Sequence, residues 1–97
     1  MPAIRLAALT ALVLELLAGP AAAASCAEQP VSARGDPSRF QVVARATARG
    51  NWRAKVRAMP TLGALYADFN RAQQTLYRCN ETDGQHVCIA EGHPCRD

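Results

Sequence analysis

Four cysteines constrain the fold of this chain of 97 residues more than any other feature. They are Cys26, Cys79, Cys88 and Cys95, and three of them lie in the C-terminal stretch YRCNETDGQHVCIAEGHPC. Exported chains oxidise an even set of cysteines to disulfides, whereas cytosolic chains use such sets for metal or redox chemistry. The N-terminal segment therefore decides how these cysteines are interpreted.

The first 24 residues have the layout of a secretory signal peptide. Arg5 supplies one positive charge, an apolar run extends over residues 6–18, and small residues follow a Gly19-Pro20 break. The apolar run is shorter than the about 20 residues that span a membrane. We predict cleavage after Ala24, which places a mature domain of residues 25–97 in the periplasm or outside the cell.

An alternative is a lipoprotein signal, because Cys26 follows the small residues Ala24 and Ser25. Such signals usually carry leucine three positions before the lipidated cysteine, and Ala23 stands there instead. We therefore favour an ordinary peptidase site.

The mature chain is short enough to need cross-links. Domains below about 80 residues rarely bury enough apolar surface to offset the entropy of ordering, so they add disulfides, a metal or a partner. With the prediction of export, an even cysteine count indicates one small domain held by disulfides.

Two signals stand at the start of the mature chain. The stretch PVSARG alternates Val31 and Ala33 with polar residues, which indicates a short strand. Asp36-Pro37 is a typical helix start, because aspartate caps free backbone N–H groups and proline suits the first helical position. We therefore expect a helix to begin near Pro37.

Two rows of residues spaced four apart indicate a helix up to Met59. One row is apolar (Ala44, Ala48, Trp52 and Val56) and the other is basic (Arg45, Arg49, Arg53 and Arg57). Residues four apart stack on one helical face. The alternative is a strand up to Ala48 and a shorter helix capped by Asn51, because Gly50 weakens a helix by about 1 kcal/mol.

A second amphipathic helix is predicted after Pro60, with Thr61 as its cap. Its apolar residues follow helical spacing: Leu62, Leu65, Tyr66, Phe69, Ala72 and Leu76. We expect it to pack on the first helix, with Leu65 and Phe69 against Trp52 and Val56.

The C-terminal stretch predicts a hairpin. Asp83-Gly84 favours a two-residue turn in which both residues have positive φ. That turn places Cys79 opposite Cys88 at a non-hydrogen-bonded pair, within disulfide reach. Cys26 is then left to pair with Cys95, which ties the two ends of the mature chain together.

The same stretch contains the triplet His-x-Cys twice, which suggests an alternative metal site. Its ligands are His86, Cys88, His93 and Cys95, a set that suits zinc or copper. The spacing matches no closed-site pattern, and exported thiolates must stay reduced to bind. Haem and thioredoxin-like motifs do not occur. We expect no cofactor.

Catalytic signatures are weak. Glu81 faces His86 across the predicted hairpin, but such a pair is more often a surface contact than an acid–base pair. The sequence contains no nucleophile-elbow serine and no glycine-rich phosphate loop. We expect a protein that is not an enzyme.

The basic row, Arg45, Arg49, Arg53 and Arg57, is a candidate anion-binding site. Like charges four residues apart destabilise a helix mildly, so an anionic partner would explain them. The competing interpretation is a solvated face, because the net charge is only +3 and no exposed aromatic residues are interleaved. Nucleic acid is therefore an unlikely partner; a protein or another envelope component remains open.

The chain resembles a group of small exported proteobacterial proteins of unknown function. The matching residues are Ala44-x3-Ala48-x3-Trp52-x3-Val56, Gly63-x2-Tyr66-x2-Phe69-x2-Ala72, and Cys79, Cys88 and Pro94-Cys95. Phe69 stands where the group has tryptophan, and Met59-Pro60 interrupts a more continuous helix. The resemblance implies export and a helix, and no activity.

These patterns predict a small α+β domain with a short strand, two helices and a disulfide-stapled β-hairpin. The expected function is non-enzymatic: binding, or a structural role in the cell envelope. Metal binding through the two His-x-Cys triplets is the second hypothesis, and binding of an anionic surface through the basic row is the third.

Overall fold

The computed structural model describes residues 25–97, so the predicted signal peptide lies outside the described residues. In chain order the elements are β1 (Ser25–Cys26), β2 (Val31–Arg34), α2 (Gln41–Ala58), the 3-10 turn η1 (Ala64–Tyr66), β3 (Gln73–Thr82), β4 (Gln85–His93) and β5 (Cys95–Arg96). The domain is α+β, as predicted, but residues 25–97 contain one α-helix where two were expected.

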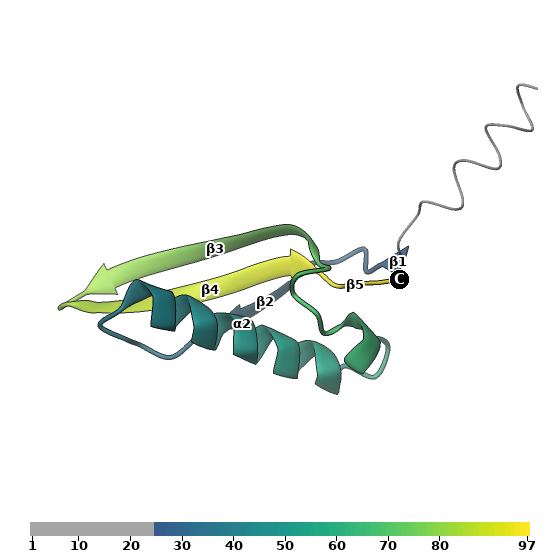
Figure 1. The fold of residues 1–97 in the computed structure, drawn as a ribbon, viewed down its shortest axis with the longest axis horizontal. Helices are drawn as coiled ribbons and strands as arrows, with labels where there is room; N and C mark the ends of the chain where they lie inside the picture. Colours follow the sequence, from purple (N-terminus) through teal and green to yellow (C-terminus); the bar gives the residue numbers. More distant parts are fainter. Residues whose placement is uncertain (1–24) are drawn as a thin grey trace, which may run out of the picture.

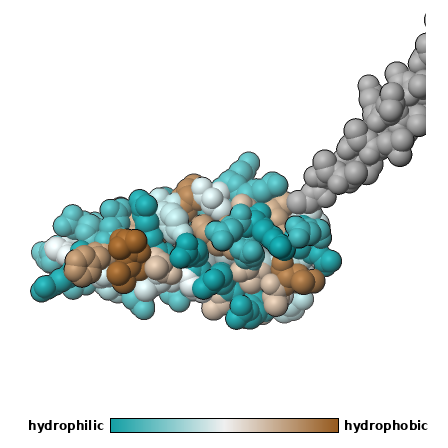
Figure 2. Space-filling model, in the orientation of Figure 1, coloured by the Kyte–Doolittle hydropathy of each residue, from teal (hydrophilic) through white to brown (hydrophobic). Residues whose placement is uncertain are grey.

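The helix covers one face of an antiparallel sheet. The sheet has the strand order β2-β4-β3, and the short strands β1 and β5 pair at one end of it. Figure 1 shows α2 against the sheet, starting near the hairpin turn and diverging from β3. Figure 2 shows a mostly hydrophilic surface with separate groups of hydrophobic side chains, one toward the narrow end and another at the opposite end.

The predicted first strand is confirmed as β2. Val31 pairs with Gly92 and Ala33 with Ala90, so the two apolar residues of β2 lie on the same face of the sheet as the core. Val31 is buried, whereas Arg34 is exposed on the opposite face. Alternation of the side chains explains this split.

The predicted start of the helix is wrong by four residues. Ser38 exchanges two backbone hydrogen bonds with His86 of β4, which keeps this segment extended. The N-cap is Phe40, with no side-chain cap. Asp36 does not cap the helix, and its backbone N–H donates instead to Thr47 Oγ1. Pairing with β4 outweighs the local Asp-Pro signal.

The apolar row of the helix is confirmed. Ala44, Ala48, Trp52 and Val56 are all fully buried. The alternative strand up to Ala48 is wrong, because α2 runs unbroken through Gly50. Residues at a spacing of four form the continuous stripe that the sheet covers.

The predicted second helix is wrong. Only η1 is helical in this region, and Gly63 has a φ of 80°, a left-handed conformation that favours glycine. Leu65 is 63% exposed and does not pack on α2, whereas Phe69 is buried against Trp52. Leu76 lies in β3. Strand pairing with β4 takes Leu76 out of the expected helix, and before β3 the chain forms turns instead, such as the one closed by the Ala72 N–H donating to the Phe69 carbonyl.

The predicted hairpin is confirmed in turn and register. Asp83 and Gly84 have φ values of 54° and 77°, and β3 pairs with β4 so that Cys79 lies opposite Cys88. The disulfide Cys79–Cys88 joins the two strands. It lies against the helix, because Cys88 is fully buried in the core.

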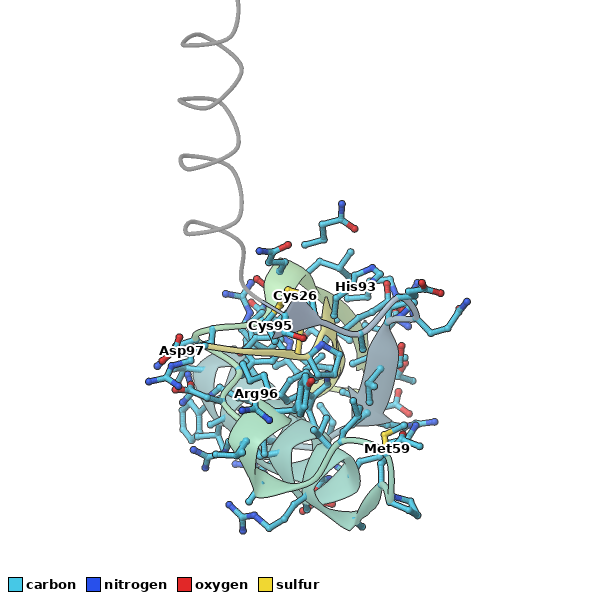
Figure 3. The ribbon with its side chains drawn as sticks, turned by 90° about the vertical axis from the view of Figure 1, so that its right-hand side faces the viewer. Cys26, Met59, His93, Cys95, Arg96 and Asp97 are labelled. Atoms are coloured by element: carbon cyan, nitrogen blue, oxygen red, sulfur yellow. A yellow bond between two sulfur atoms is a disulfide. The ribbon has the colours of Figure 1, made fainter. Side chains whose placement is uncertain are left out.

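The second disulfide, Cys26–Cys95, joins β1 to β5. Figure 3 views this end of the domain, with Cys26 and Cys95 beside each other. His93 Nδ1 lies 3.0 Å from the Ala27 carbonyl and adds a further link between the two chain ends. Two intact disulfides indicate an oxidising compartment.

Candidate functional site

The helix closes one flank of the sheet. Asn51 Nδ2 donates to the Arg34 carbonyl at 2.8 Å, and Lys55 Nζ donates to the Ser32 carbonyl at 2.7 Å. In the alternating antiparallel pattern these two carbonyls point away from β4. Side chains of α2 therefore cap the outer edge of β2.

The opposite flank of the helix is open and forms the helix–β3 groove. It begins as a hollow of about 260 Å³ and continues into a hollow of about 180 Å³. The first is lined by Val42, Arg45, Ala46, Arg49 and Tyr77, and the second by Arg49, Arg53, Asp68, Phe69 and Asn70. Arg49 lines both, so the two hollows adjoin.

The structure places three of the four predicted arginines in this groove. They are Arg45, Arg49 and Arg53, and all three are exposed. Arg57 is exposed on the same row but lines neither hollow. The row borders the groove because each arginine follows a residue of the buried apolar row, one helical step of about 100° around the axis.

The positive charge of the groove is not neutralised. Among residues 25–97, no ion pair within 4.0 Å engages Arg45, Arg49 or Arg53. Asp68, which lines the groove, is 3.7 Å from Arg71 instead. The Arg45 guanidinium lies 5.5 Å over the Tyr77 ring, a cation–π contact that leaves its charge available.

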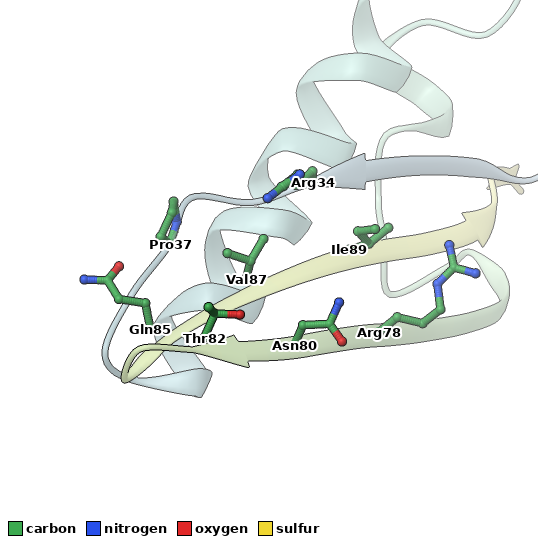
Figure 4. Close-up of a pocket in the computed structure, with 8 residues that line it drawn as sticks. All are labelled: Arg34, Pro37, Arg78, Asn80, Thr82, Gln85, Val87 and Ile89. Atoms are coloured by element: carbon green, nitrogen blue, oxygen red, sulfur yellow. The ribbon is translucent and has the colours of Figure 1, made fainter.

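A larger hollow of about 560 Å³ lies on the face of the sheet that points away from α2. Figure 4 shows its lining residues, which come from the β2 side and from the hairpin: Arg34, Pro37, Arg78, Asn80, Thr82, Gln85, Val87 and Ile89. The sequence patterns did not lead us to predict this open face. The hairpin register contained the signal, because residues next to core-facing Cys79 and Cys88 must point outward.

The open face is balanced in charge at one end. Glu91 Oε1 accepts a 2.7 Å hydrogen bond from Ser32 Oγ and lies 3.6 Å from Arg78 Nη2. Antiparallel sheets commonly leave one face solvated, with polar side chains on it. We therefore take this face as the solvent side of the sheet rather than as the first candidate site.

The residues of the predicted metal site are not brought together. Cys88 and Cys95 belong to different disulfides, so neither is a free thiolate. His86 and His93 lie at opposite ends of β4, roughly 23 Å apart at about 3.3 Å per residue. Within residues 25–97 no three His, Cys, Asp or Glu side chains are grouped to hold a metal ion.

Glu81 and His86 face each other across the hairpin, as predicted. Glu81 is exposed, and His86 is half-buried. The pair lies at the tip of the domain, outside the hollows described above.

The Cys26–Cys95 disulfide is incompatible with lipidation of Cys26, because it uses the Cys26 sulfur. A lipidated cysteine uses the same sulfur for a thioether. No helix in the described part of the chain is both long and apolar enough to cross a membrane.

Comparison of the chain with family models, with curated proteins and with solved structures found no match. The resemblance to small exported proteobacterial proteins therefore remains a prediction. The function has to be argued from the geometry of the domain.

Proposed function

We propose that this chain is an exported, non-enzymatic binding protein that recognises an acidic protein through the helix–β3 groove. The observation that carries the proposal is the row of three exposed, unpaired arginines along one side of that groove. Two disulfides support export, because they form and persist in oxidising compartments.

The two flanks of the helix argue that the arginines serve a partner. On the β2 flank, Asn51 and Lys55 are used internally, as caps of a strand edge. On the β3 flank, neither Arg45 nor Arg49 forms an ion pair with any of residues 25–97 that would offset their mutual repulsion four residues apart. A carboxylate partner would supply that offset, because guanidinium groups bind carboxylates in a bidentate manner.

An acidic protein fits the groove better than a nucleic acid does. Proteins that bind single strands offer aromatic rings on which bases stack. Tyr77 is the tyrosine of the groove, and the Arg45 guanidinium lies over its ring. The net charge of +3 is also small for a protein that neutralises many phosphates.

The disulfide beneath the groove favours binding. The disulfide Cys79–Cys88 joins β3 to β4. In β3, Cys79 is separated by Arg78 from Tyr77, the residue that lines the groove. Phe69 packs on both Trp52 and Tyr77, with ring centroids 5.0 and 5.6 Å apart. Because Phe69 and Tyr77 are held in place in this way, this side of the groove loses little conformational entropy when a partner binds. A structural role in the cell envelope would use the same surface.

The test compares two double variants that remove the same charge from opposite faces of the sheet. Arg45→Gln with Arg49→Gln alters the groove, and Arg34→Gln with Arg78→Gln alters the open face as the matched control. The probe is fluorescently labelled polyglutamate, and anisotropy titrations measure its dissociation constant. We expect the groove variant to bind about tenfold more weakly or worse, because two charge-assisted contacts are lost.

The control variant should bind within about twofold of the unmodified protein, and its salt dependence should be unchanged. Equal losses in both variants would show that only net charge matters, and would overturn the groove as the site. A larger loss in the control would move the site to the open face. Unfolding temperatures of all three proteins should agree, since every substituted arginine is exposed.

A further inference from the structure

The outer edge of β3 is free over most of its length. Within the described part of the chain, residues 25–97, β3 pairs with β4 alone and is therefore an edge strand. Cys79 lies opposite Cys88, and Glu81 lies opposite His86. Both partners form their backbone hydrogen bonds on the other side of β4, with Gly35 and Ser38. Tyr77, Cys79 and Glu81 are therefore the non-hydrogen-bonded positions of β3, since these positions alternate along an antiparallel pair. The N–H and C=O groups of these three residues therefore point outward. Within residues 25–97 none of them has a partner outside the strand.

The sheet protects its other edge and leaves this one open. Lys55 and Asn51 cap the outward carbonyls of β2. Natural edge strands are usually protected by charged side chains, lysine above all, by proline, by bulges or by shortness. β3 spans ten residues without proline or lysine, its charged residues are Arg78 and Glu81, and its one irregularity lies between Gln73 and Leu76. The straight part, residues 76–82, can accept another strand.

We propose that the acidic partner binds as an extended segment that adds a fourth strand to the outer edge of β3. The proposal rests on the proposed function and specifies how the partner is held. Backbone groups of the segment bond to Tyr77, Cys79 and Glu81, and its carboxylates reach Arg45 and Arg49. Strand addition of this kind takes its affinity from the main chain and its specificity from alternate side chains.

The geometry of the groove suits such a segment. Tyr77 and Cys79 direct their side chains to the helix side of the sheet, where they pack against the core. Alternate residues of an added strand point to that same side about 6.8 Å apart. Arginines four positions apart on a helix are separated by about 6 Å along the axis. Two acidic residues with one residue between them therefore match Arg45 and Arg49.

The start of the helix adds an apolar contact to this site. Val42 lines the groove beside Arg45 and is 75% exposed. Removing such a side chain from water on binding is favourable. The expected partner segment therefore has acidic residues at alternate positions and an apolar residue beyond them, toward the hairpin turn.

The charges disfavour a second copy of this chain as the occupant. Antiparallel pairing of two β3 edges about a two-fold axis perpendicular to the sheet leaves both helices on the same face. The arginine row of one copy would then face the row of the other across the junction. Like charges brought together without compensation oppose association. An acidic strand replaces this repulsion with attraction.

The experiment uses a peptide of alternating Glu and Thr as the probe, with the oxidised mature protein. Amide hydrogen exchange followed by NMR measures the effect of the peptide on each residue of β3. We expect slower exchange by about tenfold or more at Tyr77, Cys79 and Glu81, whose amides gain partners. Arg78 and Asn80 should change little, because their amides already bond to β4.

Two matched pairs separate hydrogen bonding from charge. Two versions of the peptide carry N-methyl groups on alternate amides, and both keep every carboxylate. The version whose methylated amides face β3 should bind about tenfold more weakly than the version whose methylated amides face away. On the protein, Glu81→Pro removes one outward N–H, and Glu81→Gln controls for the lost carboxylate. Proline is tolerated at an outward position of an edge strand, so both variants should fold. Glu81→Pro should bind more weakly than Glu81→Gln.

The outcomes separate this proposal from the proposed function. If the peptide binds in a manner that depends on Arg45 and Arg49, but the three amides gain no protection, strand addition is wrong and the groove remains the site. If neither polyglutamate nor the peptide binds, both proposals fail. If the same amides are protected without peptide, and sedimentation shows a dimer, the occupant is a second copy and the acidic strand is overturned.

Discussion

The indole Nε1 of Trp52 donates a hydrogen bond of 2.9 Å to the main-chain oxygen of Val31. Trp52 is fully buried, and its ring meets the Phe69 ring edge-on at a centroid distance of 5.0 Å. One side chain thus ties α2 to β2 and to the loop that precedes β3. The groove depends on this arrangement, because Phe69 in turn packs on Tyr77.

Trp52→Phe removes this hydrogen bond and part of the ring volume. We expect the free energy of unfolding to fall by about 2 to 4 kcal/mol, from the lost hydrogen bond and the cavity together. Urea unfolding followed by far-ultraviolet circular dichroism measures the loss. Leu65→Ala is the control: Leu65 is 63% exposed, so its truncation should cost less than about 0.5 kcal/mol. A larger loss of unfolding free energy in Leu65→Ala would show that Leu65 is part of the core.

Gly35→Ala tests the close approach of the chain after β2 to the helix. A Cβ at Gly35 would lie 2.5 Å from the Ala48 nitrogen and 2.8 Å from the Ala44 oxygen, and backbone atoms cannot turn aside. We expect a loss of about 3 kcal/mol. At Gly50 a Cβ meets nothing within 4 Å. Gly50→Ala should therefore stabilise the protein by about 0.5 to 1 kcal/mol through helix propensity. Thermal unfolding of both variants measures these opposite signs.

The two disulfides should contribute unequally to stability. In the chain-entropy model the long ring closed by Cys26–Cys95 is worth about 4 kcal/mol, and the short ring closed by Cys79–Cys88 about 3 kcal/mol. Replacing each pair with alanine, followed by urea unfolding, tests this order. Non-reducing peptide mapping should recover both pairings from the unmodified protein. Recovery of Cys79 joined to Cys95 would contradict the register of the hairpin.

Metal should not rescue the reduced protein. Reduction frees the four thiols, but His86 and His93 lie at opposite ends of β4, so the thiols and imidazoles do not converge. Circular dichroism of the reduced chain with added zinc or copper should match that of the reduced chain alone. One metal ion bound per chain in the purified protein, with Cys88 reduced, would support the metal-binding hypothesis instead.

Export predicts the mass of the mature protein. The small residues before Ser25 place the cut after Ala24, and the Cys26 sulfur is bonded to Cys95. The intact mass of the exported form should correspond to residues 25–97 with two disulfides. A mass increased by a diacylglycerol group would show that Cys26 is lipidated and that the Cys26–Cys95 disulfide does not form.

Local chemistry in the sequence determined the hairpin and the main helix. Asp83-Gly84 specifies a turn with two positive φ values, and every opposed pair up to Cys79 and Cys88 follows by counting. Ala44 to Val56 specify the buried face of α2, because a spacing of four recurs on one side of a helix. These features rest on neighbours close in sequence, so they were predictable.

Only the tertiary structure decided the segment before β3 and the start of the helix. Leu62 to Leu76 have helical spacing, yet residues 73–82 form a strand because β4, already placed by the turn, pairs with residues 76–82 and, past one irregularity, with Gln73. Likewise Ser38 pairs with His86 and delays the helix to Gln41. The groove depends on the same region, since it lies between α2, the loop of residues 68–70 that replaced part of the expected second helix, and Tyr77 of β3. The arginine row could be predicted from the sequence. Its neighbours, Phe69, Tyr77 and the edge of β3, could not, because they are placed by contacts between residues far apart in the chain.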